Sequence, residues 1–194
     1  MGALRGLYDW TIALGRTPHA LWALAAVAFV ESSFFPIPPD LLLIPMVIAA
    51  PHRAWLIAGV ATVASVLGGL FGYFIGAVLF DSVGAAIFDF YGKGDAVAEF
   101  NARFNEYGAW AVLIAGMTPF PYKVITIMSG WTGLSLPIFI VASVIARGAR
   151  FFLVAALLWK FGAPIRDFIE RYLGLVFIAF CVLLIGGFYL VRFM

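Results

Sequence analysis

Long runs of apolar residues, interrupted twice by proline clusters, set the pattern of this chain. The first apolar block, residues 20–53, is divided by Pro36, Pro38 and Pro39. Proline lacks an amide donor and disfavours a helical conformation in the preceding residue, so this block is not one continuous helix. Its two arms reach only about 15 to 22 Å, against a bilayer core of about 30 Å. The pattern therefore predicts a re-entrant helical hairpin.

A second block, residues 108–135, has the same design, with Pro119 and Pro121 at its break. Three pairs of positions coincide when the first block is shifted by 83 residues onto the second: Pro36 on Pro119, Pro38 on Pro121 and Asp40 on Lys123. A single span between the two hairpins makes them enter the membrane from opposite sides. We therefore expect an inverted repeat, with the prolines at the hairpin tips and a binding site near the membrane midplane.

Three further apolar segments are long enough to cross the bilayer: residues 54–80, 136–160 and 173–193. Two segments, residues 4–16 and 81–107, mix polar and apolar positions at helical spacing and are typical of amphipathic surface helices. We predict a single all-α integral membrane domain over residues 1–194, with two opposed re-entrant hairpins, about three transmembrane helices and short interfacial amphipathic helices.

The composition agrees with lipid as the main solvent, because 64% of the residues are apolar and only 11% are charged. The 12 basic residues are scattered, with no Lys/Arg run interleaved with aromatics, which excludes nucleic acid as a partner. The single cysteine, Cys181, has no partner in the chain for a disulfide.

The distribution of Lys and Arg predicts the orientation in the cell (inner or plasma) membrane, with the N-terminus in the cytoplasm. This orientation puts six basic residues inside: Arg5, Arg16, Arg53, Lys160, Arg166 and Arg171. It leaves three outside: Lys93, Arg103 and Arg192.

Five ionisable residues lie within apolar segments or at the hairpin breaks: Glu31, Asp40, Lys123, Arg147 and Arg150. Charge inside a membrane is costly and indicates a functional site by default. Arg147 and Arg150 are three residues apart, so both project from one face of their helix. Two acids against three bases leave a net positive charge, and guanidinium groups bind phosphate oxygens in a bidentate manner. The cluster therefore favours an anionic phosphate head group as ligand.

Two other interpretations of these charges stay open. The acids Glu31 and Asp40 could carry protons, because the charge of a carboxylate in a low dielectric depends on the cation beside it. All five residues could instead form internal ion pairs that hold the hairpins together, and we expect an Asp40–Lys123 contact. Glycines repeat every four residues at Gly68, Gly72 and Gly76, which predicts close helix packing.

Catalysis and metal binding are not expected. The chain has only His19 and His52, both near predicted membrane interfaces, whereas a membrane phosphatase would need a histidine nucleophile beside its arginines. The sequence contains no Ser-His-Asp, Cys-His or metal-ligand spacing and indicates no cofactor.

These features together resemble the DedA superfamily, the VTT or SNARE-associated Golgi domain proteins. The resemblance rests on Glu31 before the Phe-Pro-Ile-Pro-Pro-Asp segment at residues 35–40, on the second proline hairpin, and on Arg147 and Arg150 beside Gly148, and it covers roughly residues 20–160. Many members carry Arg-Phe-x-Pro-x-x-Arg in the second hairpin, where this chain supplies only Lys123, displaced by one position. It is nearer the shorter YqaA-like branch.

The resemblance implies lipid translocation, of undecaprenyl phosphate or a glycerophospholipid, with coupling to protons, and it assigns functional roles to Glu31, Asp40, Arg147 and Arg150. A proton- or sodium-coupled carrier of a small solute is the alternative, because the same inverted-repeat layout would serve it. The glycine rows leave open a structural or assembly role and a homo-oligomer as a further partner.

Overall fold

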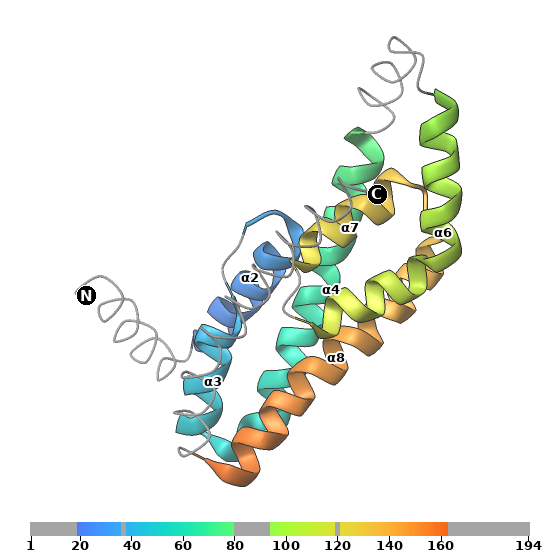
Figure 1. Ribbon diagram of the computed structural model, residues 1–194. Helices are drawn as coiled ribbons and strands as arrows, with labels where there is room; N and C mark the ends of the chain where they lie inside the picture. The colour runs from blue at the N-terminus through green and yellow to red at the C-terminus, as the bar shows by residue number, and fades with distance from the viewer. Residues whose placement is uncertain (1–18, 36–37, 80–93, 119–120, 163–194) are drawn as a thin grey trace, which may run out of the picture.

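A computed structural model describes residues 19–35, 38–79, 94–118 and 121–162, and within these ranges every regular element is a helix (Figure 1). Several predictions lie outside the described residues: the surface helix at residues 4–16, the last span at residues 173–193, the tips Pro36 and Pro119, and Cys181.

The first unit of the fold is a proline-broken pair of short helices followed by one long helix. The short helices are α2 (Ala20–Ser33) and α3 (Asp40–Ala49), and a 3-10 turn, η1 (Pro51–Arg53), leads into α4 (Ala54–Leu79). Pro39 lies at the N-cap of α3, where its missing amide donor costs no helical hydrogen bond, and α3 continues through a second proline, Pro45, in its interior. The helix is thus interrupted near the prolines, between Ser33 and Asp40, as predicted, and the predicted long helix is present as α4.

The second unit has the same order of elements: α6 (Gly94–Met117), α7 (Tyr122–Trp131) and α8 (Leu136–Phe161). We predicted that a surface helix ends at residue 107 and that a separate hairpin arm begins at Gly108. That boundary is wrong, because α6 is one continuous helix of 24 residues through Gly108. A single glycine lowers helix stability by only about 1 kcal/mol, which is too little to end a helix that packs along its length.

The last two helices of the first unit match those of the second unit in length, whereas the first helices, α2 and α6, have 14 and 24 residues. The short helices α3 and α7 each have 10 residues, and the long helices α4 and α8 each have 26. Their first residues are 82 positions apart, one fewer than the offset between the prolines. At this offset Asp40 corresponds to Tyr122, where the sequence had placed it on Lys123. The inverted orientation of the units stays a prediction.

The two units interlock around the long helices, which run side by side through the middle of the molecule (Figure 1). Helix α2 packs on α4 and helix α6 on α8, each within its own unit. The other short helices also contact the opposite unit, because α7 packs chiefly on α4, and α3 packs on both α8 and α4. Neither unit therefore completes its core without the other.

The glycine row of α4 is the face on which two short helices pack, as the sequence predicted. A Cβ at Gly68 would overlap the backbone carbonyl of Phe29 on α2, and one at Gly76 would overlap the backbone carbonyl of Ile127 on α7. Because only a hydrogen fits at these positions, α2 and α7 approach α4 at backbone contact distance.

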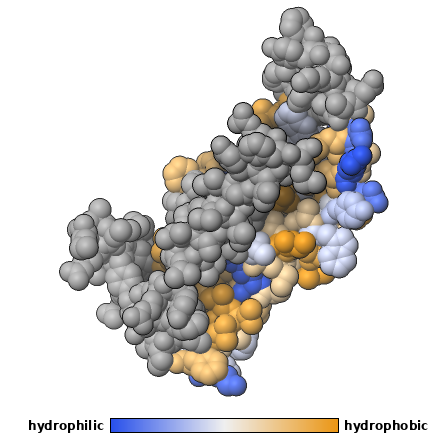
Figure 2. All heavy atoms as spheres, viewed as in Figure 1, coloured by the Kyte–Doolittle hydropathy of each residue, from blue (hydrophilic) through white to orange (hydrophobic). Residues whose placement is uncertain are grey.

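The exposed surface is apolar, which fits a lipid environment. Helices Leu136–Phe161 and α4 with its preceding turn, Pro51–Leu79, are both long and apolar enough to cross a membrane. Figure 2 shows hydrophobic residues over much of the visible described surface, with hydrophilic residues gathered mainly over α6 and at the lower end of the view. Large apolar side chains such as Val63, Phe74 and Val141 are exposed on the long helices.

Two clusters of buried apolar residues flank the centre of the molecule. One joins α2, α3, α4 and α8 and includes Leu24, Leu43 and Phe151; the other joins α6, α7 and α8 and includes Tyr122 and Phe139. Buried polar side chains lie between the two clusters.

Candidate functional site

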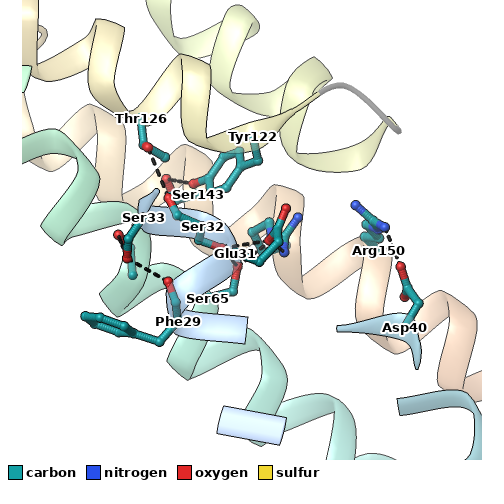
Figure 3. A network of polar contacts seen from close by, with 12 residues as sticks. Phe29, Glu31, Ser32, Ser33, Asp40, Ser65, Tyr122, Thr126, Ser143 and Arg150 are labelled. Atoms are coloured by element: carbon teal, nitrogen blue, oxygen red, sulfur yellow. Dashed lines mark hydrogen bonds and ion pairs between the residues drawn. The ribbon is translucent and has the colours of Figure 1, made fainter. Parts of the chain in front are cut away.

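Four of the five predicted site residues meet in two ion pairs that α8 makes with α2 and α3. Arg147 Nη2 donates to Glu31 Oε2 of α2 at 2.8 Å, and Arg150 Nη2 donates to Asp40 Oδ2 of α3 at 2.6 Å (Figure 3). The pairs join segments more than 100 residues apart in sequence. The three-residue spacing on α8 allows one helix face to serve both acids.

Arg147 is the centre of the site and is completely buried. Its Nε donates to Ser65 Oγ of α4 at 2.5 Å. Its guanidinium carbon lies 4.9 Å from the ring centre of Tyr122 and 4.7 Å from that of Phe151, which come from different apolar clusters. Cation–π contacts of this kind stabilise a desolvated cation by about 2 kcal/mol or more.

One edge of the Arg147 guanidinium has no acceptor. Nη1 is buried and makes no hydrogen bond to any described residue, although Nε and Nη2 are both bonded. A buried donor without a partner costs roughly 1 to 3 kcal/mol, and more for a charged group. The Nη1 atom is therefore a ready point for an anionic oxygen.

Serine hydroxyls connect the Glu31–Arg147 pair to the neighbouring helices. Ser32 Oγ donates to Glu31 Oε2 at 3.1 Å and lies 2.7 Å from Ser65 Oγ. Thr126 of α7 donates to the backbone carbonyl of Ser32 at 3.1 Å, so α2, α4 and α7 all meet beside the pair (Figure 3).

A second polar contact ties α7 to α8. Tyr122 is the first residue of α7, and its hydroxyl donates to Ser143 Oγ of α8 at 2.5 Å. Both residues are fully buried. The bond sets the position of the Tyr122 ring that covers Arg147.

The Asp40–Arg150 pair is less buried than the Glu31–Arg147 pair. The Arg150 side chain keeps 23% of its surface exposed, and the Asp40 side chain 10%. Asp40 is the first residue of α3, where the helix dipole favours a negative charge. Its second oxygen, Oδ1, is buried and has no hydrogen-bond donor among the described residues.

Lys123 is the predicted site residue that stays outside this network. Within the described part of the chain it forms no ion pair, so the expected Asp40–Lys123 contact is wrong. Asp40 reaches Arg150 because α3 packs on α8. The two acids neutralise the two arginines, and the surplus positive charge of the cluster is left on the half-buried Lys123.

Sequence reasoning missed the residues that orient Arg147, namely Ser32, Ser65, Tyr122 and Ser143. Ser65 is a small residue near the glycines of α4, so the sequence indicates no role for it beyond packing. A signal was present, because Ser65 in α4 and Arg147 in α8 are each the twelfth residue of helices of equal length. Corresponding positions face each other where two such helices cross.

Other chemistry has little support in the described residues. His19 and His52 are exposed near helix ends, and neither is among the hydrogen-bond partners of Arg147 and Arg150 in the described residues. No group of three His, Cys, Asp or Glu side chains that could hold a metal ion occurs within the described ranges.

Apolar long helices that cross at a buried, ion-paired arginine define a helical membrane protein with a charged core. The chain belongs to the VTT domain family, the domain of the DedA superfamily, since the family model matches residues 37–160. The membrane class and the family resemblance are thus confirmed.

Two bacterial proteins are similar to this chain over most of its length. An uncharacterized protein of Haemophilus influenzae is 38% identical over 168 residues, covering 84% of this chain and 87% of its own length. An uncharacterized homologue from Histophilus somni is 39% identical over 168 residues, with the same coverage. No solved structure matches the chain.

Proposed function

We propose that this protein is a membrane transporter that moves the anionic phosphate head group of a lipid, undecaprenyl phosphate or a glycerophospholipid, across the cell inner membrane. The observation that carries the proposal is Arg147, a fully buried arginine within an apolar helix, whose Nη1 has no acceptor in the part of the chain that the structure describes. An arginine inside a membrane is retained at a cost of roughly 2.5 to 3.5 kcal/mol, which a purely packing role does not require.

The architecture supports a transport role. Helix α3, with 10 residues, is about 15 Å long and is too short to cross a bilayer core of about 30 Å. We propose that α2 with α3 forms one re-entrant hairpin, that the end of α6 with α7 forms the other, and that the two enter from opposite sides. The equal lengths of α3 and α7 and of α4 and α8 favour this inverted repeat, as does the packing of α3 on α8 and of α7 on α4.

The charges support an anionic ligand that travels with protons. Glu31 and Asp40 neutralise both arginines, so the cationic groups left for phosphate are the Lys123 ammonium and the Nη1 of Arg147, neither of which has a partner in the described ranges. A proton on Glu31 would remove the charge that balances Arg147 and so strengthen its attraction for an anion. Proton uptake and head-group binding therefore favour each other in this proposal.

The orientation follows the positive-inside rule. The Trp55 and Trp159 rings lie 6.1 Å apart, which puts the start of α4 and the end of α8 at the same end of the molecule. Arg53 and Lys160 therefore lie together at that end. We propose that it faces the cytoplasm, together with the N-terminus.

Translocation in proteoliposomes tests the proposal. Short-chain fluorescent analogues of undecaprenyl phosphate and phosphatidylethanolamine are followed with and without a pH gradient. We compare the wild type with Glu31→Gln and Arg147→Ala, using Arg103→Ala as the control, because Arg103 pairs with Glu99 on the exposed face of α6.

We expect translocation by the wild type and by Arg103→Ala, and its loss in folded Glu31→Gln and Arg147→Ala. Failure of the wild type to move either lipid under any gradient would overturn the proposal. That result would favour the small-solute carrier or an assembly role instead.

A further inference from the structure

Arg147 belongs to a closed ring of four side chains from three helices. Going round the ring, Arg147 Nε donates to Ser65 Oγ, Ser65 contacts Ser32, Ser32 donates to Glu31 Oε2, and Arg147 Nη2 donates to the same oxygen. The four distances lie between 2.5 and 3.1 Å. Helices α2, α4 and α8 are thus joined at one point.

The direction of every hydrogen bond in the ring is fixed. Each serine hydroxyl has one hydrogen to donate. Ser32 donates its hydrogen to the Glu31 carboxylate, so the contact between the serines must be donated by Ser65. Ser65 in turn can only accept from Arg147 Nε, which it does. Hydrogen bonds aligned in one direction polarise and strengthen one another.

The ring also determines which atoms of the ion pair stay free. Oε2 of Glu31 receives two donors, whereas Oε1 has no hydrogen-bond partner among the described residues and the side chain keeps 16% of its surface exposed. On Arg147, Nε and Nη2 each donate a hydrogen bond, whereas Nη1 has no acceptor among the described residues. One acceptor, Oε1, and one donor, the buried Nη1, are thereby left without a partner among the described residues.

The charged groups near the Glu31–Arg147 pair are engaged elsewhere, so the serines are the groups that orient the pair. The other titratable or charged groups around the pair are Arg150 of α8, Asp40 of α3 and Tyr122 of α7, and α4 contributes no charged residue to it. Arg150 and Asp40 are paired with each other, and Tyr122 uses its hydroxyl on Ser143. Among the described residues, only Ser65 fixes the Nε edge of Arg147.

We infer that Ser65 and Ser32 are positioning residues, which hold the Glu31–Arg147 pair in the one arrangement that leaves Nη1 and Oε1 free for the head group and the proton. The inference rests on the proposed function for the identity of these two ligands. The positioning itself is a property of the folded chain and can be measured without transport.

A double-mutant cycle on unfolding tests the ring as a unit. Unfolding in mixed detergent micelles is measured for Ser32→Ala, for Arg147→Gln and for the two combined. Ser32 makes no direct hydrogen bond to Arg147, so coupling between them must pass through Ser65 or Glu31. We expect the combined effect to differ from the product of the single effects by on the order of fivefold in the unfolding equilibrium constant.

Ser33→Ala is the matched control. Ser33 is the next residue of α2, is equally buried, and gives its hydroxyl only to the backbone carbonyls of Phe29 and Gly68. The effects of Ser33→Ala and Arg147→Gln on the unfolding equilibrium constant should multiply, as expected of independent sites. If the effects of Ser32→Ala and Arg147→Gln also multiply, the ring does not act as a unit and the inference is wrong. Arg147→Lys, which also removes the Nε donor, replaces Arg147→Gln if that variant does not fold.

A transport measurement then tests what the positioning serves. In the proteoliposome assay, Ser65→Ala should raise the lipid concentration needed for half-maximal rate several-fold, Ser65→Thr should restore it because it keeps the hydroxyl, and Ser33→Ala should match the wild type. A wild-type response of Ser65→Ala would overturn the role in transport. If the wild type moves no lipid, the unfolding cycle still decides the positioning role, so the two failures are distinguishable.

Discussion

The contact between α4 and α7 yields a sharp prediction, because two glycines with opposite surroundings lie on the same helix. Gly76 faces α7, and a Cβ there would overlap the backbone carbonyl of Ile127 and approach the backbone nitrogen of Trp131. Gly59 also lies within α4, but a Cβ there would meet no atom within 4 Å. Gly76→Ala and Gly59→Ala therefore make the same chemical change with and without a neighbour.

The magnitudes follow from two effects. Replacing glycine by alanine inside a helix stabilises it by about 1 kcal/mol, and both variants gain this. Overpacking costs about 1 to 3 kcal/mol, and the upper value applies at Gly76 because backbone atoms cannot rotate away. We expect Gly59→Ala to gain about 1 kcal/mol and Gly76→Ala to lose about 2 kcal/mol, a difference of about 3 kcal/mol.

Reversible unfolding in mixed dodecyl maltoside and SDS micelles, followed by tryptophan fluorescence, measures this difference. The displaced α7 should also move the Tyr122 ring away from Arg147, so Gly76→Ala should lower translocation in protein that remains folded. Equal stability of the two variants would refute the backbone-distance packing of α7 on α4.

Two further predictions concern the polar contacts. Exchanging the charges of Asp40 and Arg150 should recover more monodisperse protein in gel filtration than either single reversal, whereas exchanging Asp40 and Lys123 should not, since these two are not paired. Tyr122→Phe should lower the free energy of unfolding by about 1 kcal/mol, because it leaves the buried Ser143 hydroxyl without its donor. Adding Ser143→Ala should restore most of that loss, and persistence of the full loss would contradict this contact as its cause.

The sequence by itself determined the helical elements of this protein, because their causes are local. Prolines remove amide donors wherever they occur, so the ends of α2, α3 and α7 near the proline clusters could be predicted. Long apolar runs indicated α4 and α8, because the transfer of apolar side chains from water into lipid is favourable. The sequence did not predict that α6 is one continuous helix. Its polar first half and apolar second half indicated two separate elements, but packing on α7 and α8 supports a single helix.

Charged residues in apolar segments were equally visible from sequence, since each carries a desolvation cost that demands a partner or a ligand. Which partner each one takes was decided only by the tertiary structure. Asp40 meets Arg150 instead of Lys123 because α3 docks on the long helix of the other unit. Ser65 looks like any small residue of a packing face until α4 and α8 cross and bring it to Arg147. Pairing depends on how helices pack across more than 80 residues of chain, and no local pattern records that.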